Sequence, residues 1–170
     1  MSKNIWINLI GFQLAWWLCV LLGNTAVLWV LVLLVLHIQF HPQPVLEIRI
    51  ILLSAGCGII VDSLLTLVGV FQFTDADWIL PLWLVVLWLA FCTTLRQGLS
   101  WFQRHYWLAS GLGGGSAALT YLGAARLGAV QLGLPEWQVF ILLVLIWSAL
   151  FPLLLWISQF TERRYVCQAS

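Results

Sequence analysis

The chain has 170 residues, of which 63% are hydrophobic and 8% are charged, with a formal net charge of +1 and a mean hydropathy of +1.03. Soluble domains carry about 25% charged residues, so this composition excludes a soluble globular domain and predicts an integral membrane protein. We expect no nucleic-acid partner.

The apolar segments are long enough for six membrane spans, since one span needs about 20 largely apolar residues. They cover residues of about 5–23, 24–40, 48–71, 78–96, 107–131 and 137–160. These spans leave no room for a soluble domain, so the sequence predicts one all-α, polytopic transmembrane domain over residues 1–170. The first span is preceded by a lysine, as in a secretory signal, but no cleavage site follows it, so we interpret it as a membrane helix.

The basic residues outside the spans indicate the orientation. With the six spans drawn in this way, six basic residues fall on one side of the membrane: Lys3, Arg49, Arg96, Arg104, Arg163 and Arg164. The loops on the opposite side contain Asp75, Asp77 and Glu136. Because Lys and Arg in short loops mark the cytoplasmic face, both termini are predicted to be cytoplasmic. Six tryptophans lie near predicted span ends, as in an aromatic belt: Trp6, Trp78, Trp101, Trp107, Trp137 and Trp156.

The first two spans contain few polar residues. Gln13 lies about 12 Å from the cytoplasmic side at 1.5 Å per residue, and its amide needs a partner, either in helix packing or at a site. His37 and His41 have the i, i+4 spacing of two metal ligands, but prolines follow and no HExxH motif is present. We therefore predict no metal and no cofactor. Glu47 and Arg49, at the start of the third span, are expected to form a solvated pair.

Two ionisable residues lie at membrane depth, Asp62 in the third span and Arg126 in the fifth. Such a residue costs about 2.5 to 3.5 kcal/mol on insertion scales and is usually retained for a paired or functional role. Both spans run outward, which places Asp62 and Arg126 about 13 and 10 Å from the outer ends of their spans. They could therefore form a polar site in the outer half of the membrane, or a buried salt bridge that only fixes helix packing. Arg126 could also snorkel to the outer surface.

The fifth span is rich in small residues, including pairs such as Gly111 and Gly115 that let helices approach closely. We expect this helix to be central in the bundle. Three consecutive glycines, Gly113 to Gly115, would allow a kink or break, but we favour tight packing as their explanation. Tyr121, in the same span, joins Asp62, Arg126 and Gln13 as a candidate for the intramembrane polar site.

Four segments carry a resemblance to a known family: GFQLAWWLCVLLG, GCGIIVDSLLTLVGVF, PLWLVVLWLAFCTTL and GGGSAALTYLGAARLGAV. In this order and spacing they resemble a family of small bacterial inner-membrane proteins with a domain of unknown function. The resemblance implies a multi-pass protein of the bacterial inner (plasma) membrane. It also implies a link to lipid chemistry, because genes of that family are often found near genes for cyclopropane and other modified fatty acids.

Three functions remain open from the sequence, and the chain is not assigned as an enzyme or a non-enzyme. The first is an accessory protein or enzyme of membrane-lipid or fatty-acid modification, with membrane lipids as its partners. The second is a small transporter or exporter, although the two halves show no obvious internal repeat. The third is a structural subunit of another membrane enzyme, which would contact the small-residue faces.

Overall fold

The computed structural model describes residues 2–74 and 79–169, so Asp75, Asp77 and Trp78 lie outside the described residues. The fold is all-α, as predicted, apart from one pair of two-residue strands. The elements are α1 (Ser2–Leu22), η1 (Gly23–Ala26), α2 (Val27–Gln39), α3 (Pro44–Leu67), β1 (Phe71–Gln72), α4 (Leu82–Cys92), η2 (Ser100–Arg104), α5 (Tyr106–Leu108), η3 (Ala109–Gly113), α6 (Gly114–Arg126), β2 (Gln131–Leu132) and α7 (Glu136–Ala169).

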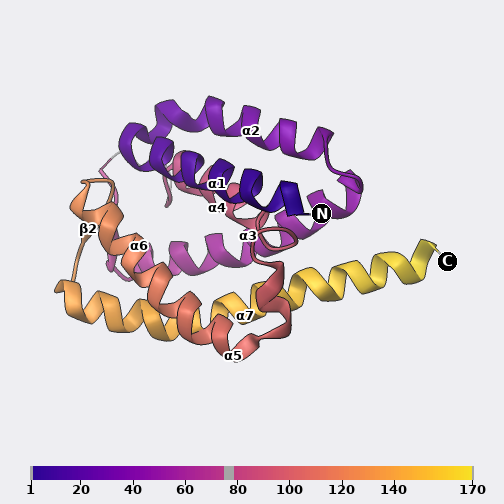
Figure 1. Cartoon of the computed structure of the whole chain (residues 1–170). Helices are drawn as coiled ribbons and strands as arrows, with labels where there is room; N and C mark the ends of the chain where they lie inside the picture. The colour runs from indigo at the N-terminus through magenta and orange to yellow at the C-terminus, as the bar shows by residue number, and fades with distance from the viewer. Residues whose placement is uncertain (1, 75–78, 170) are drawn as a thin grey trace.

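The long helices run back and forth along one direction, and both termini lie at the same end of the molecule (Figure 1). α1 and α2 form a hairpin through the 3-10 turn η1, in which Gly23 has a positive φ of 57°. Three described stretches are long and apolar enough to cross a membrane: Ile5–Gln39, Pro44–Leu67 and Glu136–Cys167. α4 is a shorter apolar helix of 11 residues. These stretches fit insertion into a membrane.

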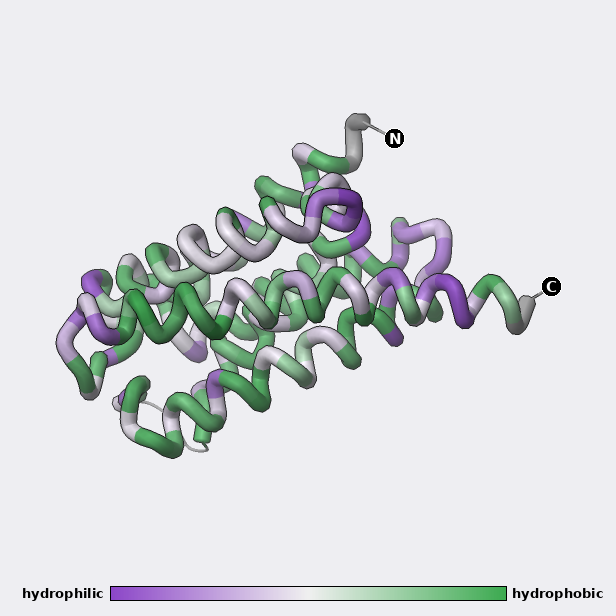
Figure 2. The backbone as a smooth tube through the Cα atoms, turned by 90° about the horizontal axis from the view of Figure 1, so that it is seen from below, coloured by the Kyte–Doolittle hydropathy of each residue, from purple (hydrophilic) through white to green (hydrophobic). Residues whose placement is uncertain are grey.

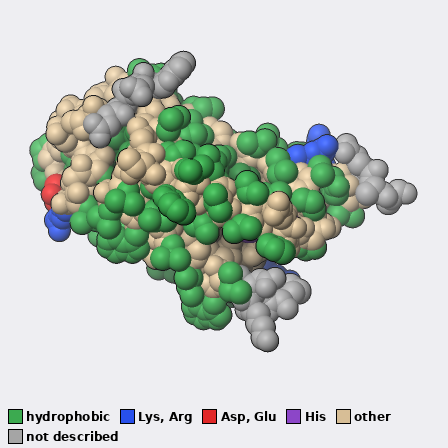
Figure 3. All heavy atoms as spheres, turned by 90° about the horizontal axis from the view of Figure 1, so that it is seen from above, with side chains coloured by type: hydrophobic (Ala, Val, Ile, Leu, Met, Phe, Trp, Pro, Cys, Tyr) green, Lys and Arg blue, Asp and Glu red, His purple; other side chains and the backbone are tan. Residues whose placement is uncertain are grey.

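The outer surface is apolar along the middle of the molecule. Hydrophilic residues gather toward the ends of the helices in Figure 2, and hydrophobic side chains cover most of the face in Figure 3. Large apolar side chains such as Leu28 on α2, Leu52 on α3 and Leu145 on α7 are 60–69% exposed. A continuous apolar surface of this extent marks an interaction surface in a soluble protein and a lipid-facing surface in a membrane protein.

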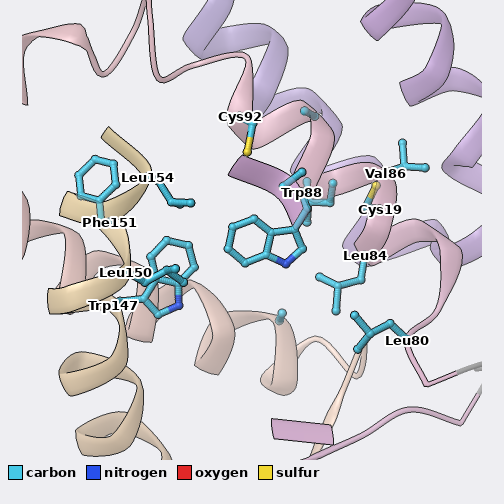
Figure 4. Packing of buried hydrophobic residues seen from close by; sticks show 14 of the residues in the cluster. Cys19, Leu80, Leu84, Val86, Trp88, Cys92, Trp147, Leu150, Phe151 and Leu154 are labelled. Carbon is cyan, nitrogen blue, oxygen red and sulfur yellow. The ribbon is translucent and has the colours of Figure 1, made fainter. Parts of the chain in front are cut away.

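α3 lies at the centre of the bundle, packed against α4 and α7, and the core gathers where these helices meet. Figure 4 shows part of this core, with Trp88 of α4 beside Trp147 of α7. α6 packs mainly on α7 and buries only Gly114, Ala118 and Ala124. The expectation that the small-residue helix is central is therefore wrong. The small residues of α6 let one of its faces approach α7, and among the described residues no other helix covers Gly115 and Gly123 on this helix.

The glycine-rich segment starts irregularly. η3 is a single π-helical turn over Ala109–Gly113, and regular α-helix resumes at Gly114. The Ser148 hydroxyl of α7 donates to the Ser110 carbonyl at 3.0 Å, which fixes this turn against the neighbouring helix. π-turns of this kind often occur near functional sites. An irregularity is thus present as a π-helical turn that ends at the first of the three glycines, and Gly114 packs closely against Val144 and Ser148 of α7, as tight packing requires.

The end of the bundle opposite the termini is closed by two matching helix ends. α3 and α6 each finish in a Schellman cap, with Gly69 (φ 79°) and Gly128 (φ 85°) in the left-handed conformation that favours glycine. The chain then continues into β1 and β2, which pair antiparallel with Phe71 opposite Leu132. These strands hold the outer ends of α3 and α6 together.

Candidate functional site

Asp62 lies in the middle of the bundle on α3 and is 1% exposed. Its carboxyl oxygen Oδ2 accepts two hydrogen bonds, each of 2.7 Å, from Trp88 Nε1 on α4 and from the Tyr121 hydroxyl on α6. A buried carboxyl group without such donors would be very costly in a membrane. The site therefore joins three helices through one oxygen atom.

Trp88 reaches this position because α3 has a glycine at the point of contact. A Cβ atom at Gly58 would overlap the six-membered ring of Trp88. The indole also stacks on Trp147 of α7, with ring centroids 5.3 Å apart and planes 6° from parallel. On the other side, the Tyr121 ring stacks on Phe71 at 5.1 Å. Both donors to Asp62 are thus fixed by aromatic contacts.

The structure does not bring Arg126 to Asp62. Arg126 lies at the last turn of α6, where its Nη2 donates to Glu136 Oε2 at 2.8 Å, and its side chain is 72% exposed. Glu136 begins α7 at the same end of the molecule. The expected pair between the third and fifth spans is therefore replaced by an exposed pair between neighbouring helices. Such a pair contributes little to stability.

A groove with a volume of about 370 Å³ passes beside this site. It lies between α4 and α6, with side chains of α1 along one side and α7 at its base. Tyr121 and Gln13 both line it, so three of the four predicted site residues belong to one region. Asp62 itself lies behind Trp88 and Tyr121. The other polar side chains on the wall are Thr94, Ser116 and Thr120, and the rest of the lining is apolar and aromatic or glycine.

This arrangement suits recognition of an apolar molecule with one polar contact. Ligand sites are typically cavities of 300–1,000 Å³ with mostly apolar walls and a few placed polar groups. The Tyr121 hydroxyl is the polar group backed by a carboxyl, and a hydroxyl joined to a carboxyl can pass a proton to or from a bound molecule. The groove therefore combines an apolar binding surface with one possible acid-base pair.

A second polar cluster lies at the end of the bundle that carries the termini. Glu47 is fully buried, and Arg96 Nη1 donates to its Oε2 at 3.0 Å, while His37 Nε2 lies 3.1 Å from its Oε1. Arg96 also donates to Glu162 of α7 at 2.7 Å. His41 Nε2 is 3.4 Å from Glu47, and burial lowers the pKa of His41 while the Glu47 charge opposes this effect. The cluster ties α2, α3 and α7 to the end of α4.

The expected solvated pair of Glu47 and Arg49 is therefore wrong. Arg49 lies over the Tyr165 ring at 5.7 Å, while Glu47 points inward. The helical spacing could have predicted that Glu47 is buried, because the buried residues Ile50 and Ile51 follow it at i+3 and i+4 and lie on the same face of α3. Within the described part of the chain, no three His, Cys, Asp or Glu side chains are arranged to hold a metal ion.

Sequence reasoning also missed the role of Trp88, which lies away from the predicted span ends and was not among the candidate site residues. A comparison of how deep the residues of different predicted spans lie in the membrane would have found this tryptophan. Trp88 lies ten residues into the fourth predicted span, or about 15 Å from its outer end, close to the 13 Å of Asp62. Indole N–H groups usually find a partner when buried, so a tryptophan at the depth of a carboxyl is a natural donor.

Comparison with known proteins gives one match. A family model with the description "Protein of unknown function (DUF2878)" covers residues 5–153. This range includes both Asp62 and its two donors, together with the groove. No curated protein and no solved structure matched the chain.

Proposed function

The chain belongs to the DUF2878 family of proteins of unknown function, and we propose that it crosses the inner membrane six times and binds a membrane lipid in its groove. In this role it is an accessory protein or an enzyme of membrane-lipid modification. The observation that carries the proposal is the apolar groove beside the buried Asp62, Trp88 and Tyr121 group.

Six spans with cytoplasmic termini are supported by the arrangement of charges. Both ends of the chain and Arg96, Arg163 and Arg164 belong to one end of the bundle, where Arg96 pairs with Glu162. Glu136 and Arg126 lie at the other end. An excess of basic residues at one end assigns that end to the cytoplasm. The tryptophans predicted for the interface and described by the structure are 52–93% exposed: Trp6, Trp101, Trp107, Trp137 and Trp156.

A lipid ligand follows from where the groove lies. Its lining helices α1, α4, α6 and α7 have apolar outer surfaces, so the surrounding medium is hydrocarbon and the molecules that can reach the groove sideways are membrane lipids. The Tyr121 hydroxyl then contacts the lipid at membrane depth, and Asp62 orients it. A modification reaction would use this hydroxyl as an acid or base, whereas an accessory role would need only the binding.

The test is a comparison of lipid extracts by mass spectrometry. A strain that lacks the gene is complemented with the wild type, with Asp62→Asn, or with Arg126→Gln, at equal abundance in the membrane. We expect a changed fatty-acid or headgroup composition with Asp62→Asn and the wild-type composition with Arg126→Gln, since Arg126 lies outside the site. Identical profiles for all three strains at equal abundance would contradict a role in lipid modification.

A structural role beside another membrane enzyme has one observation in its favour. At Gly111 of η3 and at Gly115 and Gly123 of α6, an added Cβ would meet nothing within 4 Å beyond the helix's own neighbouring backbone, so this small-residue face is open. Faces of this kind let another helix approach closely in a membrane. Gly115→Leu would then abolish co-purification of a partner from mild detergent, and purification of the wild type alone would argue against this alternative. Transport is the remaining alternative, and uptake assays with lipids and ions in proteoliposomes would test it.

A further inference from the structure

Three contacts, one between the short strands and two between helices, join residues that are 59 positions apart. The Tyr121 hydroxyl donates to Asp62 across a separation of 59 residues. Trp88 stacks on Trp147, 59 residues later, and Gln72 pairs with Gln131, again 59 residues later. A single offset that brings each residue against its own counterpart is the geometry of a twofold axis.

The same offset relates the ends of the helices. Gly69 and Gly128 are both left-handed, and both caps have the same six-to-one hydrogen bond: Val70 N donates to Leu65 O, and Ala129 N donates to Ala124 O. In β1 and β2, the strand pairing is centred on Gln72 and Gln131. Identical residues at this offset also include Leu84 and Leu143, and Val85 and Val144.

From these observations we infer that residues 48–92 and 107–151 are two copies of one helical hairpin. The two copies meet at two equivalent interfaces, of which one is closely packed and the other forms the groove. The groove holds a single acyl chain of a membrane lipid. The copies are α3 with α4, and α6 with α7. Both first helices run toward the paired strands, so the repeat is parallel rather than inverted. The second part of this inference rests on the proposed lipid function and names the part of the lipid that is bound.

The two equivalent interfaces differ in packing. The repeat makes the pair α3 and α7 equivalent to the pair α6 and α4. α3 packs along α7, whereas among the described residues α4 and α6 are separated and the groove lies between them. The surfaces that protein side chains cover in one interface are therefore left uncovered in the other. In a dry hydrocarbon medium, a chain of the same hydrocarbon is the natural filler of this space.

The length of the groove fits one acyl chain. Along η3 and α6 its lining runs from Leu112 to Ala124, which is about 18 Å at 1.5 Å per residue. The hydrocarbon core of a bilayer is about 30 Å thick, so one leaflet, and one acyl chain within it, extends over about 15 Å. A bulky ring system would not follow so long and narrow a path between two helices.

The experiment uses the full chain in vesicles of phosphatidylethanolamine that carry a photoreactive diazirine on one acyl chain. After illumination, mass spectrometry locates the modified residues. We expect labelling concentrated on the groove walls, at Leu87 and Ala117, and at least fivefold weaker at Val61 and Leu143. These last two occupy the filled interface at positions equivalent to Thr120 and Leu84 of the groove.

Two variants separate the groove from the lipid-facing surface. Ala117→Phe fills the groove and is expected to reduce labelling of Leu87 at least fivefold, whereas Leu119→Phe, on an exposed position of α6, leaves it unchanged. Labels spread evenly over exposed residues of the wild type would overturn the inference, even if Ala117→Phe fails to fold. Groove labelling together with an unchanged lipid profile for Asp62→Asn would retain the acyl-chain site and reject lipid modification. A changed lipid profile without groove labelling would reject the acyl-chain site and retain the role in lipid modification.

Discussion

Asp62 is held by one donor from α4 and one from α6, and both converge on the same oxygen. Loss of either donor leaves part of a buried acceptor unsatisfied. Hydrogen bonds inside membrane proteins contribute about 0.6 kcal/mol on average and at most about 1.7 kcal/mol, and bonds to a carboxyl group lie toward the upper end. The Tyr121 hydroxyl is therefore expected to matter both for stability and for the groove.

Tyr121→Phe removes this hydroxyl and keeps the ring that stacks on Phe71. We expect the free energy of unfolding in detergent to fall by about 1 to 2 kcal/mol. Tyr106→Phe, which removes a hydroxyl outside the site, is expected to have less than half of this effect. Thermal unfolding followed by circular dichroism measures both variants. Equal shifts would show that the bond from Tyr121 to Asp62 contributes nothing specific.

His41 gives the fold a dependence on pH at the end of the bundle that carries the termini (Figure 1). Burial lowers its pKa below the ordinary value, so the unfolded chain binds a proton more readily than the folded chain does. The stabilisation is present above about pH 6.5, the ordinary pKa of histidine, and is lost as the pH falls through the lower folded value. We expect the unfolding midpoint to drop between pH 7.5 and 5.5, and to drop less in His41→Gln. A larger drop in the variant would reverse the assigned sign.

Among the elements, α6 gives matched positions for a test, one at its Schellman cap and one within the helix. Gly128 has a φ of 85°, and an alanine there would pay about 1 to 2 kcal/mol for the left-handed conformation. Gly115 lies inside α6 with open space around it, so Gly115→Ala should be neutral or stabilise by up to about 1 kcal/mol. Chemical unfolding in mixed micelles would compare the two. Similar destabilisation by both variants would contradict the role assigned to the cap.

The sequence predicted the helices well where a long apolar run ends in a clear breaker. α2 and α3 overlap the second and third predicted spans because Pro42 and Pro44 separate them, and α7 begins one residue before its predicted span. α4 ends early, at Cys92, because the Thr93 and Thr94 hydroxyls bond back to the carbonyls of Ala90 and Phe91. That local competition leaves no trace in hydropathy.

The candidate site was predicted in part. Depth alone indicated Asp62, and the polar character of Tyr121 and Gln13 within apolar spans added those two residues. The pairing of Arg126 could not be predicted, since hydropathy does not fix how a helix is rotated about its axis. Trp88 required the contact between α3 and α4, which exists because residue 58 is a glycine.

For the whole molecule, the orientation can be tested with single cysteines in a variant whose Cys19, Cys57, Cys92 and Cys167 are replaced by alanine. Leu134→Cys lies beside the paired strands, and Arg164→Cys lies near the C-terminus; both positions are exposed. A membrane-impermeant maleimide is expected to label Leu134→Cys on intact spheroplasts and Arg164→Cys only after the membrane is opened. The opposite pattern, or labelling of both before opening, would contradict cytoplasmic termini.

The separation between Asp62 and its two donors also bears on biogenesis. The ribosome synthesises Trp88 26 residues after Asp62, and Tyr121 59 residues after it. Because a ribosome adds about 5–20 residues per second, Tyr121 is synthesised about 3 to 12 s after Asp62. During that interval the carboxyl group lacks at least one of the two donors that satisfy it in the finished fold, and an acceptor buried without its donors costs about 1 to 3 kcal/mol. The contact that closes the site therefore forms only after α6 has been synthesised.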